Sequence, residues 1–272
     1  MTTLHYLHKK KNLSSTFYEI YQNCGIYQAM TAREIKVKYK QTVIGMLWVL
    51  LQPLIYTMIL AIVFSHFIKF ETKGIPYTAF VLPIIIAWTF FSKILTVGTT
   101  CLIDQSHIIT KIYFPRLLIH LSKISSCALD MLVGYVFLIP IICITINSIT
   151  IKILLLPLFS IMLIILGFGI ICLTSSLNVF YRDLGILMGF ITQIWMYASP
   201  ILYPIPDFSP RNYFIYCLNP LAGIFESMRW CIFPSYAFPV EAFTIALLET
   251  MIAFIMGMIF FKTVENKIMD TL

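Results

Sequence analysis

The chain has 272 residues, of which 60% are hydrophobic and only 11% are charged, and its mean hydropathy is +0.89. This composition excludes an ordinary soluble domain, because too few charged side chains are available to cover a water-exposed surface of that size. The net charge of +7 suggests nucleic acid as one possible partner. No basic run joins a soluble fold, however, so membrane orientation and attraction to anionic lipid explain the charge better than nucleic acid does.

Long apolar runs follow a polar and basic N-terminal segment, and each matches the roughly 20 residues that cross a bilayer as a helix. The six predicted spans are 46–68, 78–100, 121–144, 153–177, 185–203 and 243–261. Lys and Arg are more numerous in the segments that share a side with the N-terminus, which predicts that both termini are cytoplasmic. The expected fold is an all-α polytopic membrane protein in a single domain, residues 1–272. Its expected parts are a cytoplasmic segment 1–45, a six-span region 46–262 and a cytoplasmic tail 263–272.

Two further segments are neither spans nor simple loops. Residues 25–44 place apolar side chains on one stripe of a helix, with a basic edge beside it, and predict an interfacial helix on the cytoplasmic leaflet. The stripe is Ile26, Met30, Val37 and Ile44, and the basic edge is Arg33, Lys36 and Lys40. Residues 204–239 are broken by several prolines and predict short re-entrant or interfacial helices at the outer face.

The sequence contains no phosphate-binding loop and no recognisable hydrolase motif, so any ATP would be hydrolysed by another chain. We expect no catalytic residue, cofactor or metal in this chain, with ATP and Mg on a partner ATPase. The seven cysteines show no metal-site spacing and resemble small buried hydrophobes. Lys93, Asp130 and Glu249 lie on different predicted spans, and as isolated groups they do not indicate an ion pathway. A functional role for any one of them stays open, and the alternative is a buried pairing or snorkelling near a helix end.

Aromatic residues make up 15% of the chain, and many lie toward the outer half of the predicted fold. Two interpretations remain open: an interfacial belt that anchors the protein in lipid, or a lining that stacks on sugar rings. The candidate residues for a translocation path and outer gate are Tyr56, Trp195, Tyr197, Tyr203, Tyr213, Phe225 and Trp230.

The cytoplasmic link 104–116 ends in Tyr113-Phe114-Pro115-Arg116. Pro115 suits the first turn of the next helix, where the missing N–H has no use. An exposed Tyr and Phe on a cytoplasmic turn would need a partner surface, and a groove in another protein is the predicted one.

Four motifs, in order along nearly the whole chain, carry a family resemblance. They are R-E-I-K-V-K-Y-K-Q-T-V-I-G-M-L-W-V-L-L-Q-P at 33–53, K-I-Y-F-P-R at 111–116, N-V-F-Y-R-D-L at 178–184, and S-P-I-L-Y-P at 199–204 followed by L-N-P at 218–220. In the first motif the key positions are Tyr39, Thr42, Ile44, Gly45, Trp48, Leu51 and Pro53. The pattern resembles the permease subunits of ABC-type polysaccharide exporters, within the type-2 ABC permease superfamily.

The resemblance implies a homodimer with two copies of a separate ATPase. Together they would export a polysaccharide on a polyprenyl diphosphate or another lipid, such as O-antigen, teichoic acid or capsule. It makes 25–44 a cytoplasmic gate helix, places a coupling helix for the ATPase in 104–116, and makes 205–235 the outer gate helices. The implied coupling residues are Lys111, Tyr113, Phe114, Pro115 and Arg116, with Arg182 and Asp183 either supporting them or anchoring the fifth span.

Arg33, Lys36 and Lys40, with Tyr39 and Trp48 nearby, lie where a lipid diphosphate would arrive at the inner headgroup level. We predict that these residues recruit the diphosphate, with ordinary lipid binding as the alternative. Other interpretations of the whole chain are a type-2 permease for a small lipophilic molecule, a membrane enzyme that modifies lipid-linked glycan, and a non-catalytic scaffold. The absence of grouped acid and base residues disfavours the enzyme.

Overall fold

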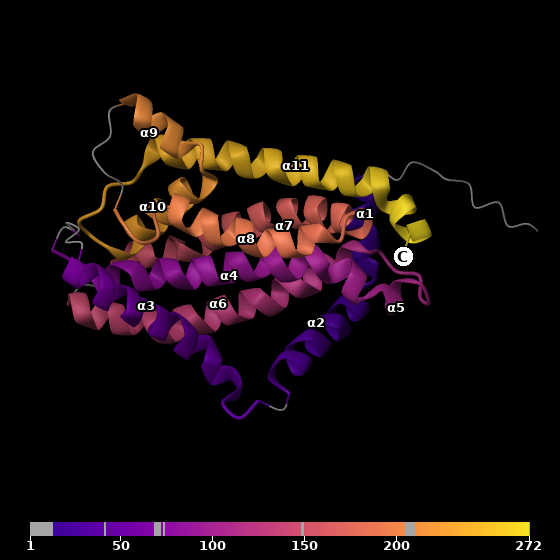
Figure 1. Ribbon diagram of the computed structural model, residues 1–272, viewed down its shortest axis with the longest axis horizontal. Helices are drawn as coiled ribbons and strands as arrows, with labels where there is room; N and C mark the ends of the chain where they lie inside the picture. Colours follow the sequence, from indigo (N-terminus) through magenta and orange to yellow (C-terminus); the bar gives the residue numbers. More distant parts are fainter. Residues whose placement is uncertain are drawn as a thin grey trace, which may run out of the picture.

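A computed structural model of the chain describes residues 13–40, 42–67, 72, 74–147, 150–204 and 210–271. All regular structure in these residues is helical, and the long helices lie side by side in one bundle (Figure 1). In chain order the helices are α1 (Leu13–Gln22), α2 (Cys24–Tyr39), the 3-10 turn η1 (Gly45–Leu47), α3 (Trp48–Phe67), α4 (Tyr77–Asp104), α5 (Ser106–Ile109), α6 (Leu117–Ile146), the 3-10 turn η2 (Ile151–Leu155), α7 (Leu156–Phe180), α8 (Asp183–Ala198), α9 (Pro210–Cys217), α10 (Pro220–Ile232) and α11 (Val240–Thr271).

Within the described residues, five helical stretches are long and apolar enough to cross a membrane. These are Gly45–Phe64, Tyr77–Asp104, Leu117–Ile146, Ile151–Phe180 and Val240–Thr271. They correspond to the first four predicted spans and the sixth, so the chain is a multi-pass membrane protein. Helix α4 is central, since it packs against α3, α6, α7 and α8 and most of its apolar stretch is buried.

The fifth predicted span, 185–203, is shorter than expected. Helix α8 has 16 residues and ends at Ala198, and Ser199 is extended, with φ −108° and ψ 153°. The physical reason is Pro200, because a proline disfavours the helical conformation in the residue before it. Figure 1 shows α8 running along the bundle like the longer helices. Five spans therefore stand on length and composition, and the sixth stays a prediction.

The ends of the bundle differ in what they carry. Figure 1 shows α1, α5 and the C-terminus at one end, and α9 and α10 at the opposite end. Helix α11 has 32 residues, so the predicted tail 263–272 is helical through Thr271. Its close packing on α7 depends on two glycines, since a Cβ on Gly257 would overlap the backbone carbonyl of Gly169. Gly189 of α8, by contrast, makes no such close contact, because a Cβ there would meet nothing within 4 Å.

Helix α2 departs from the predicted interfacial helix 25–44. It ends at Tyr39, where Lys40 is extended (φ −65°, ψ 133°), so Ile44 is not part of it. Ile26 and Met30 pack against the core, but Val37 is 65% exposed. The prediction of one apolar stripe is therefore wrong. Helices α2 and α3 instead form a V beside the bundle (Figure 1), and α2 packs against α6.

The proline-rich segment 204–239, which we predict to lie at the outer face, forms two short helices, α9 and α10, in its described residues. Pro220 occupies the first turn of α10, and the side chain of Asn219 accepts a hydrogen bond from the Leu221 N–H at 3.2 Å. Arg229 of α10 is wholly buried. It pairs with Glu226, donates to the Ile201 carbonyl oxygen at 3.1 Å and stacks 4.0 Å from the centre of the Phe80 ring. These contacts fix α10 against α4 and the turn after α8.

Candidate functional site

A polar stripe runs along one face of the central helix α4. Its members are spaced by three or four residues, which places them on the same side of a helix. They are Thr89, Ser92, Lys93, Thr96 and Thr100, and all are partly exposed. The other faces of the same helix turns are buried among apolar neighbours, for example at Ile94 and Leu95. An otherwise apolar span therefore presents one polar face.

Two adjoining pockets lie over this stripe. The larger, of about 280 Å³, lies between α3, α4 and α8, and a smaller one of about 30 Å³ lies between α3, α4 and α6. Gln52, Thr89 and Lys93 line both pockets. The larger volume is close to the lower end of the roughly 300–1,000 Å³ typical of small-ligand sites. We call the two pockets together the α4 groove.

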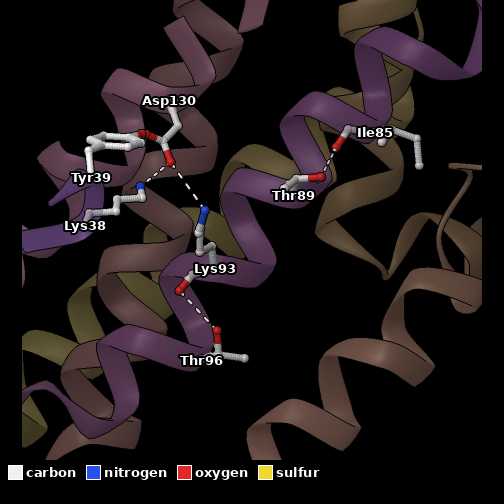
Figure 2. Close-up of polar contacts among 7 residues, drawn as sticks. All are labelled: Lys38, Tyr39, Ile85, Thr89, Lys93, Thr96 and Asp130. Carbon is white, nitrogen blue, oxygen red and sulfur yellow. Dashed lines mark hydrogen bonds and ion pairs between the residues drawn. The ribbon is translucent and has the colours of Figure 1, made fainter. Parts of the chain in front are cut away.

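The hydroxyl groups of the two threonines that line the α4 groove donate hydrogen bonds to backbone carbonyl oxygens of their own helix. Thr89 donates to the Ile85 carbonyl oxygen at 2.7 Å, and Thr96 donates to the carbonyl oxygens of Ser92 at 3.0 Å and Lys93 at 3.2 Å (Figure 2). Each hydroxyl oxygen keeps lone pairs that can accept a hydrogen bond. The groove therefore suits a ligand that carries hydroxyl donors.

Aromatic side chains close the groove toward the α9 and α10 end. Tyr56 of α3 donates a hydrogen bond to the sulfur of Met196 on α8 at 3.3 Å. Trp88, which precedes the polar stripe, is only 6% exposed. The three side chains line the larger pocket, and the Tyr56–Met196 contact bridges α3 and α8 across it.

A charged cluster forms one wall of the groove (Figure 2). Lys38 of α2 and Lys93 of α4 both contact Oδ2 of Asp130 on α6, with the Lys93 Nζ at 3.4 Å, and the Tyr39 hydroxyl donates to Oδ1 at 2.5 Å. Burial and the adjacent Asp130 carboxylate raise the pKa of Tyr39 above its ordinary value, so Tyr39 stays a donor. Of the alternatives left open for these intramembrane charges, the structure shows a buried pairing, because Lys93 of α4 and Asp130 of α6 are paired across two helices.

This pairing has an energetic reason. A charged side chain at the centre of a membrane helix costs about 2.5–3.5 kcal/mol on insertion scales. Asp130 has a side-chain exposure of 12%, so its carboxylate depends on neighbouring cations and donors. Two lysines and one carboxylate leave the cluster with one formal positive charge beside the groove.

Polar contacts also dock the rest of α2 on the bundle. Glu34 binds Lys123 of α6 at 2.5 Å and accepts from the Gln105 amide at 2.8 Å. Tyr27 and Ser125 share a hydrogen bond of 2.5 Å. The inward face of α2 is therefore held by ion pairs and hydrogen bonds in addition to the apolar contacts of Ile26 and Met30. Its basic edge, Arg33, Lys36 and Lys40, is exposed.

A second pocket, of about 170 Å³, lies at the bundle end that carries α5. Its lining combines the link after α5 with the last turns of α11: Ile109, Thr110, Lys111, Ile112, Tyr113, Phe114, Arg116 and Met269. Arg116 Nη1 pairs with Glu265 Oε1 at 3.0 Å, which ties the start of α6 to the end of α11.

Comparison with known proteins identifies the class of this membrane protein. A family model described as ABC-2 type transporter matches residues 26–233, which is well over half of the chain. The chain belongs to the ABC-2 type transporter family. It is thus the membrane subunit of a transporter rather than an enzyme, and family membership implies an ATPase partner.

Curated relatives match this permease over most of their length. It is 29% identical to an "O-antigen export system permease protein RfbA" of Klebsiella pneumoniae over 250 residues, which cover 89% of this chain and 93% of the relative. A protein of the same name from Myxococcus xanthus is 24% identical over 218 residues, covering 78% of this chain and 81% of the relative.

The residues expected to couple an ABC-2 permease to its ATPase lie at one end of the bundle, but they differ in exposure. Lys111, Arg182 and Asp183 are exposed, and Tyr113 is 80% exposed. Phe114 is only 5% exposed, so it packs inside the permease and the expectation that it faces a partner is wrong. Pro115 lies just before the N-cap residue of α6, Arg116, and not in the first turn of the helix as expected, and Arg116 is held by Glu265.

The aromatic path candidates are not brought together as one lining. Tyr56 lines the α4 groove, and Tyr197 is 58% exposed. Phe225 is wholly buried within α10, so it faces no path in this conformation. The remaining candidates hold the outer helices: the Trp195 indole donates to Asn219 Oδ1 at 3.0 Å, Tyr203 donates to the Tyr197 carbonyl oxygen at 3.1 Å, and Trp230 lies 4.9 Å from the Phe238 ring. Tyr213 lies partly buried in α9, and Trp48 is 47% exposed at the start of α3.

The sequence reasoning missed most of the groove itself. Lys38 contacts Asp130, whereas the neighbouring Arg33, Lys36 and Lys40 were singled out. Gln52, Thr89, Ser92 and Thr96 were also missed. Their signal was present, since Thr and Ser recur at three- and four-residue spacing around Lys93 inside an apolar run.

Proposed function

We propose that this permease is the transmembrane part of an ATP-driven exporter of lipid-linked polysaccharide, and that the polysaccharide is O-antigen. It would move the glycan on a polyprenyl diphosphate from the cytoplasm to the outer face of the inner membrane. The observation that carries the proposal is the match to O-antigen export permeases over about nine-tenths of the chain. Teichoic acid or capsular polysaccharide is the alternative cargo.

The lining of the α4 groove supports a sugar cargo. Threonine oxygens can accept hydrogen bonds from sugar hydroxyls, and the partly exposed ring of Tyr56 can stack on the apolar face of a sugar ring. Lys93 is the only charged residue among those lining the larger pocket. Few fixed charges would favour passage of a polymer over its tight retention.

The exposed basic edge of α2 would recruit the lipid diphosphate. Arg33, Lys36 and Lys40 point away from the α2 contacts with α6 and are accessible to lipid headgroups. Clustered basic residues near the cytoplasmic leaflet attract anionic groups at about 1 kcal/mol each. Tyr39 and Trp48 would flank the entrance to the α4 groove, at the end of α2 and the start of α3.

The assembly would be a homodimer with two ATPase subunits, and each permease would have six spans with both termini in the cytoplasm. The 16 residues of α8 extend about 24 Å, which a bilayer can accommodate by local thinning. The exposed Lys111, Tyr113, Arg182 and Asp183 would contact the ATPase, and α9 and α10 would form the outer gate as re-entrant helices.

Deletion of the gene tests this function directly. Lipid-linked polysaccharide is followed by gel and mass spectrometry in surface and cytoplasmic fractions of the source organism. The proposal expects glycan to accumulate inside and to disappear from the surface, and the accumulated species identifies the cargo. Unchanged surface glycan, without a redundant copy of the gene, would refute polysaccharide export and favour a small lipophilic substrate.

A further inference from the structure

Lys93 is not required to hold or to neutralise the Asp130 carboxylate. The carboxylate already receives the Tyr39 hydroxyl on Oδ1 and the Lys38 ammonium on Oδ2. The Lys93 Nζ lies 3.4 Å from Oδ2, longer than an ordinary charged hydrogen bond of about 2.7–2.9 Å. Lys38 alone neutralises the carboxylate, so charge balance within the protein does not explain a second lysine at this position in a span.

Lys93 is also the cluster member that extends along the whole groove, whereas Asp130 lines only the smaller pocket. Its side chain is 36% exposed, against 24% for Lys38 and 12% for Asp130, and it lines both pockets of the α4 groove. An ammonium group carries three N–H donors, of which the long contact to Asp130 uses at most one. Gln52, on the facing helix α3, adds amide donors to the wall that the two pockets share.

The donors and acceptors of the groove differ in the ligand groups that they suit. Thr89 and Thr96 already donate to backbone carbonyl groups, so their hydroxyls can accept from a ligand but have no proton left for an anion. Lys93 and Gln52 carry the donors that an anion requires. The groove therefore combines one anion-binding position with neighbouring positions for neutral hydroxyls.

We propose that Lys93 and Gln52 form a binding subsite for the diphosphate of the lipid-linked glycan, inside the α4 groove and distinct from the basic edge of α2. This inference rests on the proposed function. The diphosphate diester carries two negative charges, and the surplus positive charge of the cluster complements them. Lys93 can turn from Asp130 to the diphosphate, because Lys38 and Tyr39 continue to hold the carboxylate. Thr89 and Thr96 then accept from hydroxyls of the first sugar.

Amine footprinting on the wild-type complex tests the subsite without any substitution. The permease is purified with its ATPase, placed in nanodiscs of neutral lipid, and its lysines are reductively methylated with and without undecaprenyl diphosphate. We expect the lipid diphosphate to protect Lys93, as measured by mass spectrometry. Undecaprenol, which lacks the diphosphate, should give no protection. Inorganic pyrophosphate distinguishes a free anion from a lipid headgroup. If pyrophosphate protects Lys93 and undecaprenyl diphosphate at the same concentration does not, the assignment to a lipid-linked ligand is wrong.

Affinity measurements on variants supply the second test. Binding of labelled undecaprenyl diphosphate should weaken by roughly tenfold or more in Lys93→Gln and change by less than about threefold in Lys93→Arg. Lys267→Gln, which removes an exposed charge on α11 far along the chain, is the matched control and should bind as wild type. Equal affinity of Lys93→Gln and the control, with Lys93 unprotected in the footprint, would refute the subsite.

Cellular export separates this inference from the proposed function. If deletion of the gene blocks surface glycan but Lys93→Gln exports normally, the subsite is wrong and the exporter stands. If deletion leaves surface glycan unchanged, the exporter itself is wrong. Loss of export in Lys93→Gln with retention in Lys93→Arg and Lys267→Gln supports both.

Discussion

Removal of one partner from the buried Glu226–Arg229 pair is expected to destabilise the permease strongly. In Arg229→Met the Glu226 carboxylate, with a side-chain exposure of 9%, loses its cation and stays buried. Breaking a buried ion pair on one side costs about 3–5 kcal/mol. The Ile201 carbonyl also loses its 3.1 Å donor, and Phe80 loses a stacked cation worth about 0.5–2 kcal/mol. We expect a total loss of about 4 kcal/mol in the free energy of unfolding.

Unfolding of the purified permease in mixed dodecyl maltoside and SDS micelles measures this loss, with tryptophan fluorescence as the signal. The double variant Glu226→Gln/Arg229→Met should recover a large part of the stability, because no unpaired charge remains in the interior. Lys267→Met on the exposed side of α11 should change stability by less than about 0.5 kcal/mol. The reasoning would be refuted by a loss below about 1 kcal/mol in the free energy of unfolding of Arg229→Met. It would also be refuted if the loss in the double variant equalled the sum of the losses in Glu226→Gln and Arg229→Met.

The remaining predictions concern packing, substrate recruitment and coupling. Gly257→Ala should cost about 1–3 kcal/mol in the same unfolding assay, because its Cβ overlaps the Gly169 carbonyl, while Gly189→Ala should be neutral; equal stabilities would contradict the close α7–α11 contact. Replacing Arg33, Lys36 and Lys40 together by Gln should slow appearance of surface glycan without loss of the purified complex, and normal export would argue against recruitment. Tyr113→Asp should release the ATPase during purification, whereas Phe114→Asp should first lower the stability of the permease itself, because Phe114 is buried. Retention of the ATPase by Tyr113→Asp would count against this surface.

The long spans could be predicted because their signal is local. A run of about 20 apolar residues is sufficient to identify a membrane helix, and five of the six predicted spans correspond to helices of this kind in the described residues. The end of α8 depended on one residue, Pro200, whose effect on Ser199 the hydropathy pattern does not register. The position of Phe114 was misjudged for another reason. The link 104–116 folds back against the end of α11, and a contact between segments about 150 residues apart leaves no local trace.

Of the two lysines that pair with Asp130, one could be predicted from the sequence and helix geometry, and the other could not. Asp130 has Ser126, Cys127, Val133 and Gly134 at the helical neighbour positions, so no cation on its own helix can pair with it. An ionised carboxylate in a span must then find a cation on another helix. The predicted spans contain two lysines, Lys93 and Lys123, and Lys123 lies on the same predicted span as Asp130, so Lys93 is the lysine that a different span offers. That pairing was therefore within reach of the sequence. The contact from Lys38 was not, because it requires α2 to end beside the middle of α6. It is this second contact that leaves Lys93 as surplus charge in the groove, and so the most specific functional inference depends on the fold.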